Sequence, residues 1–384
     1  MNNKYQVLFI THYNGMYGAN QSLCKLMVEL RKNYNICPIV LLPSRGPICE
    51  FLEDNDIKYY IFHFYWWVNA DTGFFQALLN IRKQFLNILR LPKLLQILKN
   101  NEINLVYSNS ITINIGFYLS KILHRPHIWH IRESMDAYKF KYSMGVFFSN
   151  FFLQTGADRY IVISDFLIKT YAGILPSSKI QKVYNGVSIK VNEKVNRIHV
   201  VDTLNICCIG VMCEQKNQLE ILEALNILKE EGKTNIRLHL IGSSKKDYLQ
   251  EVNDYINRNK LEEMVCIYGH QSNVNDILDT MDIGVVAAHD EAFGRASIEY
   301  MLHKMPVIAS QSGANQEIVK DGVNGYLYSL YNPKQLANKV KLFLKDPFHT
   351  KIIGAVAFRY AQQKFSSEQN AREVNNIMLD LLKK

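Results

Sequence analysis

The 384-residue chain is 48% hydrophobic and 21% charged, a composition that excludes fibrous and disordered proteins. Because the chain is longer than a domain with a single hydrophobic core normally is, we expect two domains. The net charge of +9 lies in the first half, because residues 1–190 hold 21 Lys and Arg against 11 Asp and Glu, whereas residues 191–384 hold 23 against 24. A basic half attracts polyanions such as acidic lipid headgroups or a phosphorylated substrate, although solubility alone would also explain the excess.

Strand-like and helix-like segments alternate through the first half. The run 5–12 is short and apolar, and after a glycine-containing turn Leu23, Leu26, Met27 and Leu30 recur at the spacing of one helix face. Further apolar runs, separated mostly by helix-length segments, have the length of strands: 36–43, 57–64, 103–110, 127–133 and 159–165.

The second half repeats the pattern, with strand-like runs at 204–210, 236–242, 264–269, 282–288 and 306–310. Strands that are apolar on both faces and alternate with helices indicate parallel sheets covered on both sides. We therefore expect an α/β fold of two tandem Rossmann-like, doubly wound domains whose strand ends face a shared cleft. Because the segment 187–203 is polar and lacks periodicity, the predicted domains are 1–190 and 204–365, joined by a linker at 191–203.

Two loops that follow predicted strands carry weak ligand-binding signals. Gly15 and Gly18 flank a turn, and the next helix would direct its free N–H groups at an anion. No GxGxxG pattern can be drawn here or after Gly210, which disfavours a nicotinamide dehydrogenase. Lys216 stands close to a helix start, where an ammonium can neutralise a phosphate, although a solvated surface lysine is the commoner case.

The strongest segment is 289–301. Glu291 lies in the loop, Gly294 permits close backbone approach, a helix begins near Arg295, and Glu299 falls eight residues after Glu291. Two carboxylates about two helical turns apart are suited to bind an extended polyhydroxylated ligand and are too far apart to share a proton. A buried glutamate without hydroxyl groups or other hydrogen-bond donors beside it is costly. The bare spacing is also typical of two unrelated surface acids, but the glycine and the preceding strand favour a ligand site.

In this setting the second half resembles glycosyltransferase family 4, a retaining group with the GT-B fold. The resemblance covers about residues 10–325, and the matching pieces occur in the expected order: 16–23, 129–133, 184–187, 210–218, 291–299, 312–317 and 321–325. It implies an acceptor-side first domain and a second domain that binds a nucleotide-sugar donor. It also implies that the last helix, about 366–384, packs back on the first domain.

The resemblance implies three catalytic residues. Glu291 would hold hydroxyls of the donor sugar, and Lys216 would bind the diphosphate of the donor. His130 would contact the sugar near the reacting carbon. A histidine flanked by Trp129 and Ile131 is also typical of a buried core position, and this alternative stays open. Glu299 would bind the ribose hydroxyls. The other implied donor contacts are made at Gly18, Gly210, Phe293, Gly294 and Arg295, and the implied acceptor-side residues are Asn20, Arg132 and Glu133.

The sequence thus predicts a retaining glycosyltransferase that moves a sugar from a nucleoside-diphosphate-sugar to a lipid-linked oligosaccharide in the assembly of capsule, exopolysaccharide or O-antigen. Val211 and Ala288 stand where many relatives carry Arg and Ser, which puts the strength of donor binding in question.

No Asp-x-Asp motif or histidine ligand spacing predicts a metal or another cofactor, and dispersed lysines disfavour nucleic acid. A nucleotide-sugar epimerase of the same fold and a catalytically inactive binding or scaffold protein remain alternatives.

A possible membrane-facing segment lies in the basic half. Residues 59–67 are dense in aromatic side chains, and residues 74–99 are apolar and basic without any acid, a pattern of helices that lie in a membrane interface or of a helix pair packed on a sheet. Four phenylalanines could join this face: Phe147, Phe148, Phe151 and Phe152.

No apolar run reaches the roughly 18 to 20 residues of a membrane span, no signal peptide is evident, and seven cysteines without a CxxC pair indicate a reducing compartment. We therefore expect a cytoplasmic protein, peripheral to the inner face of the cell membrane and its anionic lipids.

Overall fold

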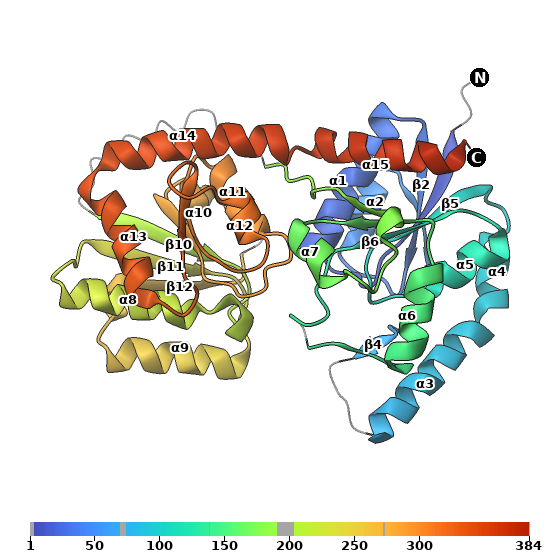
Figure 1. The fold of residues 1–384 in the computed structure, drawn as a ribbon, viewed down its shortest axis with the longest axis horizontal. Helices are drawn as coiled ribbons and strands as arrows, with labels where there is room; N and C mark the ends of the chain where they lie inside the picture. The colour runs from blue at the N-terminus through green and yellow to red at the C-terminus, as the bar shows by residue number, and fades with distance from the viewer. Residues whose placement is uncertain (1–3, 70–73, 138, 190–202, 272, 384) are drawn as a thin grey trace. The chain divides into compact units, whose positions relative to one another are not determined.

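The computed structural model describes residues 4–69, 74–137, 139–189, 203–271 and 273–383. The chain forms two compact units, each built on a sheet of its own (Figure 1). Unit 1 comprises residues 1–186 and 367–384, and unit 2 comprises residues 187–366. The predicted linker, residues 191–203, lies outside the described residues except for its last position.

Unit 1 contains a seven-stranded parallel sheet in the order β3-β2-β1-β5-β6-β8-β9. Its strands are β1 (Tyr5–Ile10), β2 (Ile36–Leu42), β3 (Lys58–Ile61), β5 (Ile103–Ser108), β6 (His127–Ile131), β8 (Arg159–Val162) and β9 (Ile180–Lys182). A separate antiparallel ribbon pairs β4 (Val68–Asn69) with β7 (Lys141–Tyr142). The helices are α1 (Gly18–Asn33), α2 (Ile48–Asp54), α3 (Phe74–Leu89), α4 (Leu91–Leu98), α5 (Ile115–Leu123), α6 (Gly145–Thr155), α7 (Asp165–Thr170) and α15 (Ser367–Leu382).

Alternate residues of β1 show how the sheet of unit 1 is covered on both faces. Val7 and Phe9 join a buried cluster with side chains of α1, α2 and α15. Leu8 and Ile10 point the other way and join a cluster with α4 and α5. A parallel sheet must be covered in this way because both of its faces are apolar.

Unit 2 contains a six-stranded parallel sheet in the order β12-β11-β10-β13-β14-β15. Its strands are β10 (Leu204–Ile209), β11 (Ile236–Ile241), β12 (Val265–Gly269), β13 (Ile283–Val286), β14 (Val307–Ser310) and β15 (Gly325–Tyr328). The helices are α8 (Gln218–Glu230), α9 (Lys246–Arg258), α10 (Asn275–Leu278), α11 (Arg295–Leu302), α12 (Asn315–Ile318), α13 (Pro333–Lys345) and α14 (Pro347–Lys364). Both sheets run outward from their first strand in both directions, which confirms the predicted doubly wound α/β fold.

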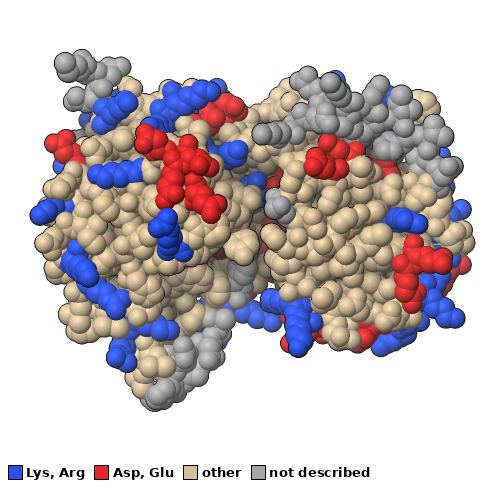
Figure 2. Space-filling view, turned by 180° about the vertical axis from the view of Figure 1, so that it is seen from behind, with Lys and Arg blue, Asp and Glu red and all other residues tan. Residues whose placement is uncertain are grey.

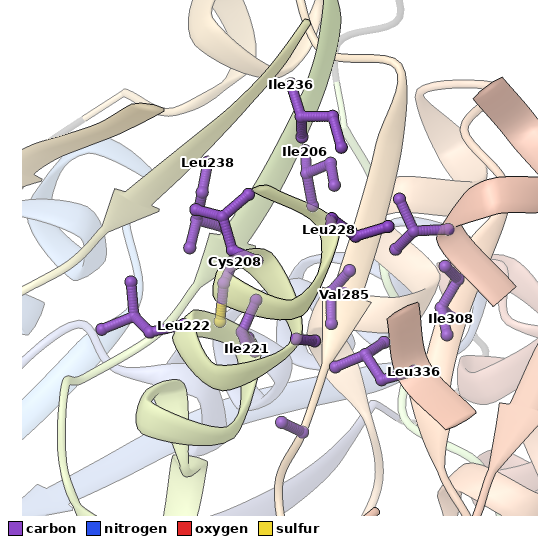
Figure 3. Close-up of a cluster of buried hydrophobic side chains, with 14 of the residues drawn as sticks. Ile206, Cys208, Ile221, Leu222, Leu228, Ile236, Leu238, Val285, Ile308 and Leu336 are labelled. Carbon is purple, nitrogen blue, oxygen red and sulfur yellow. The ribbon is translucent and has the colours of Figure 1, made fainter. Parts of the chain in front are cut away.

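The core of unit 2 lies between its sheet and the helices α8 and α13. Ile206 and Leu238 from neighbouring strands pack with Leu222 of α8 and Leu336 of α13 (Figure 3). Cys208 belongs to the same cluster and is a buried free thiol, so it acts as a small apolar side chain.

The aromatic run 59–67 lies only partly inside unit 1, and Trp66 near its end is 37% exposed. Phe62, Phe64 and Trp67 are buried, and the ring of Trp67 stacks on Trp129 with centroids 5.6 Å apart. Phe152 also points inward, and its ring meets that of Trp67 at 6.1 Å. Among the described residues, no helix has the length and apolar character that crossing a bilayer requires.

Candidate functional site

The strongest candidate site lies at the carboxyl ends of β10 and β13 in unit 2. These strands are neighbours in the sheet, and the strand order reverses between them, so the loops that follow them turn to opposite sides and leave a crevice for a ligand. Lys216 follows β10 in the short turn Glu214–Lys216, and Glu291 follows β13. The structure brings the two predicted residues together, with Lys216 Nζ 2.5 Å from Glu291 Oε2.

Glu291 is held as a carboxylate. Its side chain is only 14% exposed, and burial by itself would raise its pKa, but the ammonium of Lys216 and the backbone N–H groups of Gly294 and Phe293 hold the pKa below 4.5. The N–H of Gly294 donates to Glu291 Oε1 at 3.2 Å. At neutral pH the site therefore presents an ionised oxygen acceptor next to a cation, a pair suited to hydroxyl groups and a phosphate.

The loop that carries Glu291 is fastened by the turn after β14. The N–H of Ala314 donates to the carbonyl of Glu291 at 2.7 Å, and the N–H of Asp290 donates to Ser312 Oγ at 2.9 Å. Gly313 has φ +56, and a Cβ there would lie 2.4 Å from both the N and the O atoms of Glu291. The sequence pointed to residues 312–317 only through the family resemblance; their contacts show that they position the Glu291 loop.

Glu299 and Arg295 pair with each other rather than with Glu291. Arg295 begins α11, and its Nε donates to Glu299 Oε1 one turn later at 2.8 Å. Glu299 is 16% exposed, so its carboxylate remains accessible at the side of this helix. The ring of Phe293 is buried against Phe365, with centroids 6.0 Å apart, which leaves the backbone of Phe293 as its means of contacting a ligand.

The loop after β10 is shaped by backbone pairing with the loop after β11. The N–H of Met212 donates to the carbonyl of Ser243 at 2.7 Å, and the N–H of Lys245 donates to the carbonyl of Met212 at 3.1 Å. Gly210 has φ +140 and precedes Val211, whose side chain is 41% exposed. The position where many relatives carry Arg is therefore at the surface beside the Lys216 turn.

In unit 1, Asn20 organises the loop between β1 and α1. Its Nδ2 donates to the carbonyls of Tyr13 at 3.0 Å and Gly15 at 2.7 Å, and its Oδ1 accepts from the hydroxyl of Thr11. The side chain is completely buried, so its contacts in the structure shape this loop, and an acceptor-side role stays a prediction. Gly18 is the first residue of α1, whose N-cap makes no side-chain hydrogen bond.

Arg132 and Glu133 belong to a buried polar cluster at the carboxyl ends of the unit 1 strands. Arg132 Nε donates to Asn109 Oδ1 at 2.6 Å, and Nη1 donates to Asn185 Oδ1. Glu133 Oε1 lies 3.9 Å from Nε2 of His12. The sequence patterns did not identify His12, Asn109 or Asn185. Asn109 directly follows β5 and His12 lies two residues beyond the end of β1, and such positions after strands are where ligand groups are expected.

His130 is completely buried in β6, and its Nδ1 is hydrogen-bonded to the hydroxyl of Tyr107. Burial, followed by the nearby charge of Arg132, holds its pKa well below 6.5, so the imidazole is neutral. Its Nε2, like Nδ1 of His12 and Oε1 of Glu133, has no hydrogen-bond partner among the residues that the structure describes. A contact between His130 and a donor sugar stays a prediction, and its burial fits the core interpretation.

One comparison concerns the second half of the chain. The family model described as "Glycosyl transferases group 1" matches residues 192–360, which include both the Lys216 turn and the Glu291 loop. This part of the chain is therefore similar to that family, and we refer to the matched segment as the glycosyl transferases group 1 domain.

Two curated relatives match parts of the chain. The capsular polysaccharide biosynthesis glycosyltransferase CapM of Staphylococcus aureus is 25% identical over 194 residues, 50% of each chain. CapH of the same organism is 26% identical over 171 residues, 44% of this chain and 47% of that protein. The chain thus spans about half the length of these curated relatives.

The solved structures extend the likeness to both units. Anabaena HepE in complex with UDP and glucose has a TM-score of 0.79 at 21% identity, covering 98% of this chain and 100% of that chain. A glycosyltransferase from Rickettsia africae has a TM-score of 0.80 at 19% identity, with both chains fully covered. At such identities the likeness shows the fold, which is GT-B.

The glycosyl transferases group 1 domain holds most of the predicted site. Every predicted donor-binding residue except Gly18 falls inside it. The catalytic candidate His130 and the acceptor-side candidates lie outside it, in unit 1.

Acidification below pH 6.5 is expected to destabilise the protein through unit 1. Burial lowers the pKa of His12 to about 3 and that of His127 to about 4, and it lowers that of His130 as well. The unfolded chain binds protons at these histidines as the pH falls through 6.5, whereas the folded chain does not. Each histidine therefore removes up to about 1.4 kcal/mol of stability per pH unit between its two pKa values.

Urea unfolding at about pH 7 and about pH 5 measures this loss. His127→Gln is expected to reduce the pH dependence, whereas His63→Gln, at an exposed position, is expected to leave it unchanged. A free energy of unfolding that does not fall over this interval would contradict the prediction.

Proposed function

We propose that the chain is a retaining glycosyltransferase of family 4 that transfers a sugar from a nucleoside-diphosphate-sugar to a lipid-linked oligosaccharide during surface polysaccharide assembly. The observation that carries this proposal is the Lys216–Glu291 pair at the ends of β10 and β13, inside the glycosyl transferases group 1 domain. The polysaccharide context is supported by the printed names of CapM and CapH. A nucleotide-sugar donor is supported by the complex of HepE with UDP-glucose.

In the proposed reaction, Lys216 stabilises the leaving diphosphate. Negative charge grows on the diphosphate as the glycosidic bond breaks, and a preorganised cation lowers the energy of that state. An ammonium can donate three hydrogen bonds, so its bond to Glu291 does not prevent another to a phosphate oxygen. Because Lys216 supplies the cationic charge, we propose that the reaction needs no metal ion or other cofactor.

Glu291 and Glu299 are proposed to bind the donor at two places. The carboxylate of Glu291, kept ionised by Lys216, would accept hydrogen bonds from sugar hydroxyls. Glu299, at the accessible side of α11 and paired with Arg295, would accept from the ribose hydroxyls. The positive end of α11 would add favourable interaction with the diphosphate.

We further propose a same-face substitution, in which the departing phosphate oxygen assists removal of the proton from the acceptor hydroxyl. In this scheme retention of configuration requires no protein nucleophile. The neutral His130 would contact the donor sugar through Nε2, the ring nitrogen that lacks a partner among the described residues. The acceptor would be held by unit 1, in the cytoplasm at the inner face of the cell membrane.

A donor screen tests the function. Release of nucleoside diphosphate is measured with a set of nucleotide sugars, beginning with UDP-glucose, with and without a membrane extract as the source of acceptor. We expect one donor to be consumed and the extract to raise the rate. Isomerised sugar without acceptor would instead identify an epimerase, and no turnover or binding of any donor would overturn the proposal.

A further inference from the structure

Helix α3 is built with its polar face inward. Asn80, Gln84 and Asn87, spaced at i, i+4 and i+7, are each at most 3% exposed. The opposite face is apolar and open to solvent: Leu78, Ile81, Phe85, Ile88 and Leu89 are between 41% and 59% exposed. A surface helix of a globular protein normally has the reverse arrangement, with its apolar stripe on the core.

Specific hydrogen bonds fix α3 in this orientation. The side chain of Asn87 accepts from the N–H of Tyr65 and donates to its carbonyl, both at 2.9 Å. Gln84 Nε2 donates to the carbonyl of Trp66 at 2.7 Å, and Asn80 Nδ2 donates to Asn69 Oδ1 at 2.8 Å. Turning the apolar face inward would strand these buried amides without partners, which is costly.

Helix α6 adds a second apolar face. Val146, Phe147, Phe148 and Phe151 are between 57% and 82% exposed. Together α3 and α6 carry nine of the 21 large hydrophobic side chains that are exposed in the described part of the chain. The paired strands β4 and β7 precede α3 and α6 respectively, and Figure 1 shows both helices beside this ribbon on one side of unit 1. An exposed apolar concentration of this kind marks a binding surface.

We define the apolar surface as the outward side chains of α3 and α6; the charges within the two segments that contain these helices have one sign. The segments 74–99 and 139–157 contain no Asp or Glu. They contain seven cations: Arg82, Lys83, Arg90, Lys93, Lys99, Lys139 and Lys141. In Figure 2 the lower part of unit 1 carries blue side chains without red. A second copy of the chain would bring like charges together, whereas an anionic bilayer matches both the apolar side chains and the basic border.

We propose that the outward faces of α3 and α6 dock on an anionic lipid bilayer, with their phenylalanine and aliphatic side chains inserted and their Lys and Arg at the headgroups. Docking would bring unit 1 to a lipid-linked acceptor, and in this respect the inference rests on the proposed function. The part of the segment 74–99 that forms α4 does not insert into the bilayer, because Leu91, Leu94 and Leu98 of this helix are buried in the core.

Vesicle flotation tests the docking surface. We expect the full chain to float with vesicles of phosphatidylcholine and phosphatidylglycerol, to bind phosphatidylcholine alone much more weakly, and to lose binding as salt rises. The triple variant Phe85→Gln, Phe147→Gln, Phe148→Gln is expected to bind anionic vesicles about tenfold or more weakly. The matched control is Phe348→Gln with Ile352→Gln, which removes two exposed apolar side chains of α14 in unit 2 and should bind as the wild type does.

Equal binding to both kinds of vesicle, no binding to either, or an unchanged triple variant would overturn the inference. So would an oligomer of the wild type that the triple variant dissociates, because that result assigns the apolar surface to a protein contact. Donor turnover with a soluble acceptor separates the two proposals. Turnover without vesicle binding overturns only the docking surface, and vesicle binding without turnover of any donor overturns only the proposed transfer reaction.

Discussion

Replacing Lys216 by alanine is expected to lower turnover by about 10²–10³-fold while the chain stays folded, since loss of one group that stabilises developing negative charge has a cost of this size. The ammonium lies at the switch point of the sheet and touches Glu291. Its loss removes both the counter-charge of the diphosphate and the cation that keeps Glu291 ionised. The pKa of Glu291 should therefore rise in the variant, because the remaining burial favours the protonated carboxyl.

The coupling of the two residues gives the sharper test. Glu291→Gln alone should also lose most turnover, but the double variant Lys216→Ala, Glu291→Gln should lose much less than the product of the two single effects, because the residues act as a pair. Lys341→Ala is the matched control: it removes a surface lysine that pairs with Glu231 at 2.8 Å in the same unit. Steady-state rates with the donor found in the screen measure all four variants. Near-normal rates in both single variants would refute the site.

The alternation of apolar runs was sufficient to predict both central sheets. Each predicted strand overlaps a strand of the structure, because buried parallel strands form continuous apolar runs. The strands β9 and β15, with the sequences IQK and GYLY, were missed because neither lies in a continuous apolar run of strand length. The short ribbon of β4 and β7 was missed because its strands are too short to form such a run.

The site could be predicted in part, because ligand groups follow strands. Position after a strand identified Lys216 and Glu291, but their pairing across 75 residues depends on which strands are neighbours, which spacing along the chain does not reveal. The buried cluster around Arg132 was only partly predictable, because Asn109 directly follows a predicted strand, whereas Asn185 follows β9, which was not predicted.

Helix α3 shows a different limit of sequence patterns. Its periodicity reveals two faces, but it does not tell which of them points inward. That orientation depends on the segment 65–69: the backbone of Tyr65 and Trp66 bonds to Asn87 and Gln84, and the side-chain oxygen of Asn69 accepts from Asn80. Helix α4 begins two residues after α3 ends and buries its apolar face instead. One continuous basic and apolar segment therefore forms one helix with its apolar face exposed and one with its apolar face buried.

Arg132→Leu is expected to lower the free energy of unfolding of the protein by roughly 2–6 kcal/mol, because it leaves two buried amide oxygens without a donor at about 1–3 kcal/mol each. Leucine keeps the apolar stem of the side chain but cannot donate to Asn109 Oδ1 or Asn185 Oδ1. These residues follow different strands, so the guanidinium also ties together the carboxyl ends of the unit 1 sheet.

The same variant should change the response of the protein to acid, which separates loss of the charge from loss of packing. Arg132 lowers the pKa values of His12 and His130, so its removal should raise both of them toward 6.5 and make the stability less dependent on pH below that value. Arg45→Leu is the control, since Arg45 is 73% exposed and meets Glu53 at 3.5 Å, and such surface pairs contribute little. Urea unfolding at two pH values distinguishes the outcomes. A variant as stable as the wild type, or one equally sensitive to acid, would show that Arg132 does not control the charge of this cluster.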